Sequence, residues 1–322
     1  MRAPALSIVS ASIMVLSLLL SGCSKGPSSE YQLAQQGLLS GDISDDGRLA
    51  IIGSIHHGGS LWDIGNNERL FSWNHKSGTY GSFRTSALAK NGKVAVTTEE
   101  RNIGVWNTVS GKSRGFWQAP ARILSIKLNA DGSKALMGLS NGNASYFDLI
   151  QGTTIFNFEH KAEVRSVDLN ESVNIALTGS DDQRAVTWDL STGKEIASLS
   201  FNNLVKSVAL SNSGALAFAS SQREDAIVWD PLSGATKASV ASRYTNYTNA
   251  TFSDDDQQLY LGTFQGTIEQ WELSSQTKQN TWQAKPRKAY GGSNSKAIVS
   301  IRIFVDTIKA LTSDGQLQLF GR

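Results

Sequence analysis

The feature that most constrains the fold is an aromatic residue that returns about every 41 residues. Six segments end a β-branched and apolar run in such a residue and then continue into a turn. The six anchors are Trp62, Trp106, Phe147, Trp188, Trp229 and Trp271, spaced 44, 41, 41, 41 and 42 residues apart. Self-similarity at this period is typical of repeated supersecondary units that stack to share a core. The chain is therefore expected to be a repeat protein.

A second marker keeps a fixed distance from the first. Turn tetrads rich in Asp, Asn, Ser and Gly end 14 or 15 residues before each anchor, at 44–47, 89–92, 129–132, 170–173, 211–214 and 253–256. These residue types suit tight turns, because they tolerate left-handed backbone or hydrogen-bond it locally. Each unit is expected to hold four short strands separated by turns. Around Trp188 the expected strands are 164–169, 175–180, 185–189 and 195–201.

The segment TGSDDQRAVTWDLSTGKEIASL, residues 178–199, carries the strand-end Trp-Asp and its preceding turn. It resembles the WD40 repeat, and the resemblance extends over roughly residues 31–322. It implies an all-β, seven-bladed β-propeller with four-stranded antiparallel blades. Residues 298–320 supply only three strands of the seventh blade. We expect YQLAQQ, residues 31–36, to be the fourth, closing the ring and removing exposed sheet edges.

The first residues predict export. Arg2 precedes an apolar and small-residue run over 3–20, as in a secretory signal. The stretch LSGC, which ends at Cys23, resembles the lipobox of bacterial lipoproteins. The resemblance implies a lipoprotein signal peptide at 1–22, a lipid on Cys23, a flexible tether at 23–30 and the propeller at 31–322. Ser24 favours the outer membrane, facing the periplasm. A plain signal peptide or a membrane anchor is the alternative.

Composition argues against several partner classes. Thirty basic and 28 acidic residues leave a formal charge of +2, and loss of residues 1–22 leaves +1. A near-neutral chain has no strong field to attract nucleic acid, so none is expected as a partner. A lone cysteine excludes an intrachain disulfide framework. The sequence has no CxxC or Cys/His cluster, so no metal or cofactor is expected.

One unit offers a constellation of polar side chains. The WD40 resemblance implies a buried hydrogen-bond tetrad formed by His160, Ser180, Asp182 and Trp188, with Thr178 as the alternative hydroxyl. A His-Asp-Ser set also has the composition of a catalytic triad. That reaction needs an exposed nucleophile and an oxyanion hole, and nothing in the sequence marks either. A structural role is therefore expected, and no enzymatic activity.

The best indication of a binding surface comes from the start of each unit's first strand. Equivalent positions there are Leu39, Arg84, Leu124, Arg165, Lys206, Thr248 and Val299. In propellers this end of the strand lies near the channel mouth, where partners often dock. The candidate partner-binding residues are Arg84, Arg165, Lys206, Arg243 and Tyr244, since Arg and Tyr are enriched in interface hot spots. A solvated rim without a partner is the alternative.

These observations favour a monomeric, membrane-anchored, non-enzymatic platform for protein–protein interaction in the bacterial cell envelope, with an unidentified protein partner. One alternative is a factor that assists outer-membrane protein assembly. Propeller lipoproteins of that kind carry a late tryptophan in each unit, which Trp73, Trp117 and Trp282 partly match. A second alternative is a propeller hydrolase, which requires acids or histidines that converge on the channel.

Overall fold

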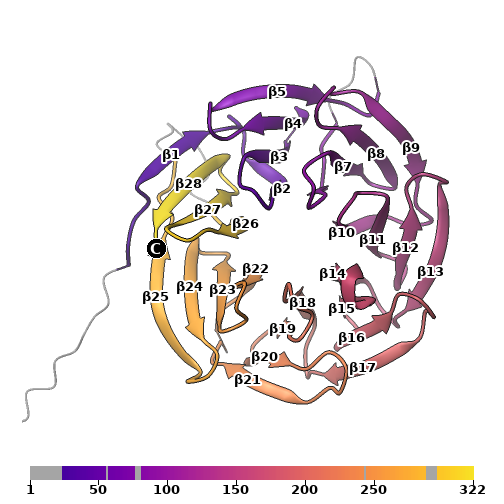
Figure 1. Ribbon diagram of the computed structural model, residues 1–322, viewed down its shortest axis with the longest axis vertical. Coiled ribbons are helices and arrows are strands. Elements are labelled where there is room, and N and C mark those ends of the chain that lie inside the picture. Colours follow the sequence, from indigo (N-terminus) through magenta and orange to yellow (C-terminus); the bar gives the residue numbers. More distant parts are fainter. Residues whose placement is uncertain (1–23, 56, 77–80, 243, 288–295) are drawn as a thin grey trace, which may run out of the picture.

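The computed structural model describes residues 24–55, 57–76, 81–242, 244–287 and 296–322. It is a ring of seven four-stranded antiparallel sheets (Figure 1). The predicted all-β, seven-bladed β-propeller is confirmed. We number the blades in chain order. The face on which each innermost strand begins is called the entry face, and the opposite face the exit face.

Each blade runs from an innermost to an outermost strand. Blades 1 to 4 are β2 Leu38–Ile43, β3 Leu49–Ser54, β4 Gly58–Asp63, β5 Glu68–Trp73; β6 Thr85–Leu88, β7 Val94–Glu99, β8 Asn102–Asn107, β9 Ser113–Gln118; β10 Ile123–Leu128, β11 Lys134–Leu139, β12 Asn143–Asp148, β13 Thr153–Glu159; and β14 Val164–Asn170, β15 Ile175–Ser180, β16 Arg184–Asp189, β17 Glu195–Ser200. Blades 5 to 7 are β18 Val205–Leu210, β19 Ala217–Ser221, β20 Ala226–Trp229, β21 Thr236–Val240; β22 Tyr247–Phe252, β23 Gln258–Thr263, β24 Thr267–Glu272, β25 Thr277–Gln283; and β26 Ile298–Ile303, β27 Thr307–Thr312, β28 Gln316–Gly321, with β1 Ser29–Gln32 outermost.

The ring closes as predicted, by a strand from the N-terminal end. β1 pairs antiparallel with β28, from Ser29 opposite Leu319 to Gln32 opposite Gln316 (Figure 1). The strand lies nearer the N-terminus than the predicted 31–36. After Gln32 the chain leaves the ladder, because the next two backbone N–H groups both bond the carbonyl of Gly315.

The tether expected over residues 23–30 differs from the structure in its described part. Lys25 bridges β25: its N–H donates to Thr281 O at 3.0 Å, and its carbonyl accepts from Gln283 N at 2.9 Å. The Ser28 N–H donates to Leu319 O at 2.7 Å. Residues 25–28 therefore run against the outer edges of blades 6 and 7.

The core lies between the blades, so the middle strands are covered on both faces. Every residue of β15 is buried. One hydrophobic cluster joins Leu136 of blade 3 to Trp188 of blade 4. The turns that follow the anchors also dock on the preceding blade. Gly193 has φ of 73°, and a Cβ there would lie 2.6 Å from Cδ1 of Phe156 in blade 3. Only glycine fits both this backbone and this contact.

The innermost strands carry bulges that explain the position of the predicted rim residues. In blade 4, Val164 pairs with Ser180 and Ser166 with Gly179, so Arg165 is the extra residue. Lys206 is the extra residue in blade 5 by the same register shift. A bulge bends the strand and redirects the unpaired side chain. Arg165 and Lys206 therefore leave the ladder at the entry face.

Candidate functional site

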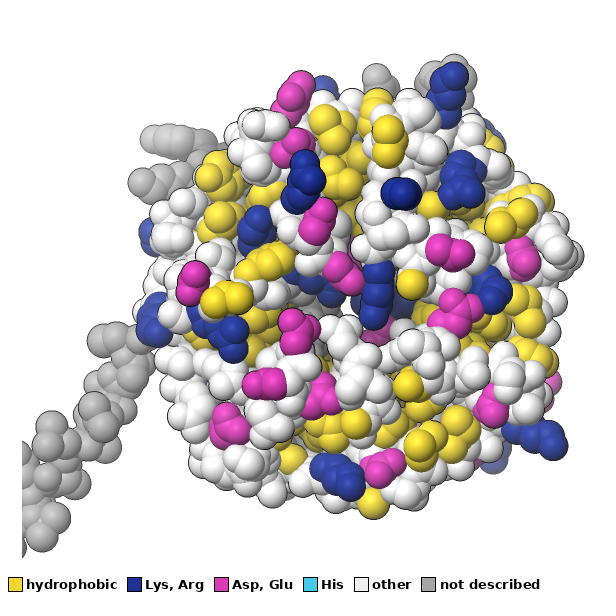
Figure 2. All heavy atoms as spheres, viewed as in Figure 1, with side chains coloured by type: hydrophobic (Ala, Val, Ile, Leu, Met, Phe, Trp, Pro, Cys, Tyr) yellow, Lys and Arg dark blue, Asp and Glu magenta, His cyan; other side chains and the backbone are white. Residues whose placement is uncertain are grey.

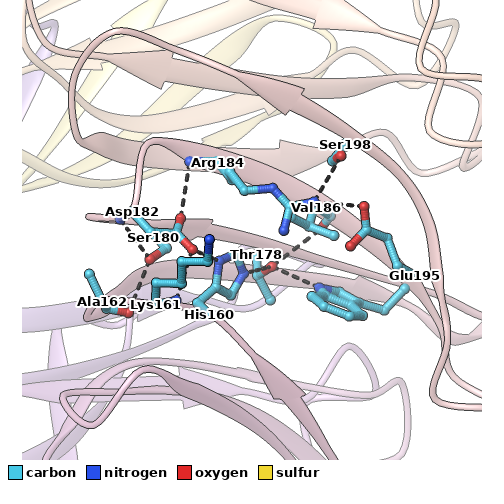
Figure 3. A network of polar contacts seen from close by, with 11 residues as sticks. His160, Lys161, Ala162, Thr178, Ser180, Asp182, Arg184, Val186, Glu195 and Ser198 are labelled. Carbon is cyan, nitrogen blue, oxygen red and sulfur yellow. Dashed lines mark hydrogen bonds and ion pairs between the residues drawn. The ribbon is translucent and has the colours of Figure 1, made fainter.

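The four-residue network of blade 4 forms, but with a different hydroxyl from the one predicted. His160 Nδ1 lies 2.9 Å from Asp182 Oδ2, and His160 Nε2 lies 2.7 Å from Thr178 Oγ1. The indole N–H of Trp188 donates to the same Thr178 oxygen at 2.8 Å (Figure 3). Trp188, Thr178, His160 and Asp182 thus form a continuous chain across the blade.

Ser180 is outside this chain, which corrects the predicted tetrad. Its hydroxyl donates to the carbonyl of Ala162 at 3.1 Å and accepts the Asp182 N–H at 3.1 Å. Alternate residues of a strand share a face, so both hydroxyls of β15 point to the same side. Thr178 lies deeper along the strand and reaches the indole of Trp188. Ser180 stands at the strand end and fixes the following turn.

A neutral His160 protonated on Nδ1 donates to Asp182 and accepts through Nε2 from the Thr178 hydroxyl, whose oxygen also lies 3.2 Å from the carbonyl of Val186. Burial lowers the pKa of His160 against the opposing effect of Asp182, which favours this neutral ring. The His160 side chain is 0% exposed, and Thr178 is also 0% exposed. The network is therefore enclosed and holds β15, β16 and the loop before β14 together.

Blade 2 contains a related network that the sequence analysis missed. His75 Nε2 lies 2.9 Å from Thr97 Oγ1, which accepts the indole N–H of Trp106 at 2.9 Å. His75 precedes its anchor by 31 residues and His160 by 28, so a search at fixed spacing passes over it. The residue in the place of the acid, Glu100, pairs with Arg84 instead. Among the described residues, His75 Nδ1 has no hydrogen-bond partner.

The predicted basic residues of the entry face are matched by carboxylates. Asp181 receives Arg165 Nη2 at 2.7 Å and Lys206 Nζ at 3.4 Å. Glu163 accepts Arg165 at 2.5 Å and Arg122 at 3.6 Å. Burial alone would raise the pKa of Asp181, but Arg165 and Lys206 outweigh it, so the pKa is lowered. Three blades are thus joined by one ionic network of three cations and two carboxylates, which keeps a net charge of +1.

The other candidates on this face lie apart from that network. Arg84 pairs with Glu100 at 3.0 Å, and both side chains are 55% exposed. Arg243 lies outside the described residues. Tyr244 is 90% exposed, in the loop between β21 and β22. The turn between β23 and β24 approaches this loop through the bond from Phe264 N to Asn246 O at 3.2 Å, and Phe264 is 60% exposed. The structure therefore adds Phe264 to the candidate residues.

Charges of both signs are mixed over the face shown in Figure 2, with cationic side chains next to the central opening.

A cavity of about 660 Å³ lies where the innermost strands end. Two of its carboxylates couple neighbouring blades: Asp42 accepts the N–H groups of Ile43 and Leu88, and Asp168 those of Leu169 and Leu210. These carboxylates accept hydrogen bonds from the backbone of two neighbouring blades, a role that the sequence did not predict.

The three late tryptophans connect successive blades. Each donates its indole N–H to a backbone carbonyl of the following blade: Trp73 to Gly111 at 2.9 Å, Trp117 to Leu149 at 2.9 Å, and Trp282 to Gly321 at 2.8 Å. Each bond spans the gap between one blade's outermost strand and the end of the next blade's third strand. These residues stabilise the circumference of the ring.

No three His, Cys, Asp or Glu side chains in the described ranges are grouped so that they could hold a metal ion. No helix in the described part of the chain has the length and hydrophobicity needed to cross a bilayer. Cys23 lies outside the described residues. Comparison with known protein families and with curated proteins found no match.

Proposed function

We propose that this protein is a WD40-like lipoprotein of the bacterial cell envelope that binds a protein partner on its entry face and has no enzymatic activity of its own. The observation that carries the proposal is the pair of exposed aromatic side chains at blade 6. Tyr244 is 90% exposed and Phe264 is 60% exposed, on two connections that are hydrogen-bonded to each other. Aromatic residues dominate interface hot spots, because they bury much area with few rotatable bonds.

The rest of the entry face suits specificity better than strong attraction. Arg165 and Lys206 already bind Asp181, so they offer an acidic partner few free charges. Exposed ion pairs at the rim of an interface mainly affect the association rate and the choice of partner. We therefore place the expected hot spot at the aromatic pair, with the ionic network beside it.

Support for anchoring comes from the sequence: the LSGC stretch and the apolar run before it. Several acyl chains on one terminus hold a protein on a membrane far better than a single chain. The lipid on Cys23, the outer membrane and the periplasmic orientation belong to this proposal.

Crosslinking in intact cells tests the binding surface. The Tyr244→Ala/Phe264→Ala variant should lose a defined crosslinked partner that the wild type captures. Leu232→Ala is the matched control, because Leu232 is 63% exposed in an exit-face turn. Loss of the partner in both variants, or in neither, argues against the entry face. Metabolic labelling with a radioactive fatty acid tests the anchor directly: the wild type should be labelled and Cys23→Ala should not, and an unlabelled wild type contradicts the lipid anchor.

A second candidate is the assembly factor for outer-membrane proteins. It is favoured by the three bonds from Trp73, Trp117 and Trp282 to the following blades. In the repeat of such assembly factors, a tryptophan late in each unit is expected to bond the following blade, and these three tryptophans do so. Depletion of the protein should then lower the amount of folded outer-membrane β-barrels, measured by heat-modifiable migration in gels. Unchanged barrel levels exclude this candidate.

A further inference from the structure

The chain enters the propeller at the outer rim, at a fixed place. Lys25 is held to β25 by two backbone hydrogen bonds of 3.0 and 2.9 Å, and its ammonium lies 5.5 Å from the centre of the Trp282 ring. From there the chain passes to β1, the outermost strand of blade 7. The described chain therefore begins between the outer strands of blades 6 and 7, on neither the entry nor the exit face.

This position limits how far the propeller stands from its anchor. Cys23 is two residues before Lys25, and two extended residues span at most about 7 Å. A lipid on Cys23 would thus hold this part of the rim at the level of the phospholipid headgroups. A flexible tether over residues 23–30 would have allowed any orientation, but residues 25–28 are bonded to the ring.

The side chains at this rim suit an anionic surface. Lys25 is exposed, the Lys285 side chain is 56% exposed, and the Lys278 side chain is 43% exposed. Two of these lysines have a carboxylate partner: Lys285 lies 3.2 Å from Glu30, and Lys278 lies 2.9 Å from Glu269. The three lysines and these two carboxylates together carry a net charge of +1. Lysines near a negatively charged leaflet are attracted to it, and the attraction falls off within a Debye length.

We propose that the rim formed by Lys25, Lys278 and Lys285 docks on an anionic phospholipid surface, so that the propeller stands on its edge. This inference rests on the lipid anchor proposed above. Edge-on docking leaves both faces open to the periplasm, including the aromatic pair at Tyr244 and Phe264. The membrane then positions the binding surface and does not cover it.

Fluorescence quenching in vesicles tests the orientation. The full-length protein, purified from membranes, is reconstituted in phosphatidylethanolamine–phosphatidylglycerol vesicles (3:1) that contain a headgroup spin-label quencher. Acylation consumes the lone native cysteine, so an introduced cysteine is the free thiol to be labelled. Gln279→Cys on β25 reports on the proposed rim. Ile155→Cys is the matched control at the equivalent position of β13, across the ring (Figure 1).

We expect quenching at position 279 to exceed that at position 155 several-fold. Lys25→Glu/Lys285→Glu should reduce the ratio toward one while the protein stays on the vesicles. Equal quenching of both labels in the unaltered rim overturns edge-on docking. The anchor itself is checked in the protein without an introduced cysteine. A reactive thiol there means that Cys23 is not acylated, and this failure of the anchor is distinguished from a failure of the orientation.

Discussion

Arg165 and Lys206 lie on adjacent blades and bind the two oxygens of one carboxylate, that of Asp181. Arg165 Nη2 is 2.7 Å from Oδ2, and Lys206 Nζ is 3.4 Å from Oδ1. Both cations are the extra residues of bulges at the start of their innermost strands. The arrangement joins blades 4 and 5 at the channel mouth, so the two predicted binding cations also make an interblade contact.

Asp181→Asn should therefore lower the free energy of unfolding by about 1 kcal/mol, because two partly covered cations lose their shared partner. The loss should shrink in 1 M NaCl, since salt screens the pair in the wild type. Urea unfolding at low and high salt measures it. The control is Glu100→Gln, whose exposed pair with Arg84 should contribute close to nothing. Equal losses in the two variants contradict the interblade role.

Thr178→Val should be among the more damaging conservative substitutions in blade 4. It keeps the volume but leaves the Trp188 N–H and His160 Nε2 unpaired in a buried site, which costs about 2–4 kcal/mol. Ser180→Ala removes a turn contact and should cost about 1 kcal/mol. Thr178→Ser should restore most of the loss. Chemical unfolding measures both losses of stability. A larger loss for Ser180→Ala than for Thr178→Val would show that Ser180, and not Thr178, is the hydroxyl of the network.

Two buried tryptophans provide a matched test of interblade bonding. Trp282 and Trp229 are both 0% exposed. The Trp282 N–H bonds Gly321 O, whereas the Trp229 N–H has no partner among the described residues. Changing each to Phe removes similar volume, so Trp282→Phe should cost about 1 kcal/mol more than Trp229→Phe. Thermal unfolding of both variants measures the difference, and equal shifts would show that the bond contributes nothing.

His75 should make stability depend on pH. Burial lowers its pKa to about 4, while an unfolded histidine titrates near 6.5. Between these two pH values His75 is protonated in the unfolded chain, whereas its imidazole stays neutral in the folded protein. Stability is thus complete above pH 6.5 and falls as the pH drops toward 4.

At pH 5 the loss due to His75 should be on the order of 1 kcal/mol, because the partly exposed ring keeps some solvation. His75→Gln should flatten the dependence of unfolding free energy on pH between 7 and 5. A remaining slope is expected from His160, whose pKa is lowered in the same direction. An identical slope in the wild type and His75→Gln would show that the pKa of His75 is the same in the folded and the unfolded chain.

The sequence by itself determined the architecture. The period of the six anchors and the turn tetrads predicted a repeat protein, and the WD40 resemblance with the incomplete unit at 298–320 predicted seven blades. The missing strand of that last unit predicted closure by a strand from the N-terminal end. Such features are local: each turn and each alternating strand is encoded by neighbouring residues. Three members of the hydrogen-bond network in blade 4 could also be predicted, namely Trp188, His160 and Asp182, because this unit matches the WD40 repeat closely.

Only the tertiary structure decided which polar groups meet. The choice of Thr178 over Ser180 depends on depth along β15, and both residues face the same side of the strand. Asp181 pairs with both Arg165 and Lys206 because bulges on two blades direct them to one carboxylate. Residues 25–28 read as a flexible tether, yet they find backbone partners on β25 and β28. Such contacts join residues that are far apart in the sequence. A repeat pattern reflects the structure within each unit and does not predict contacts between units.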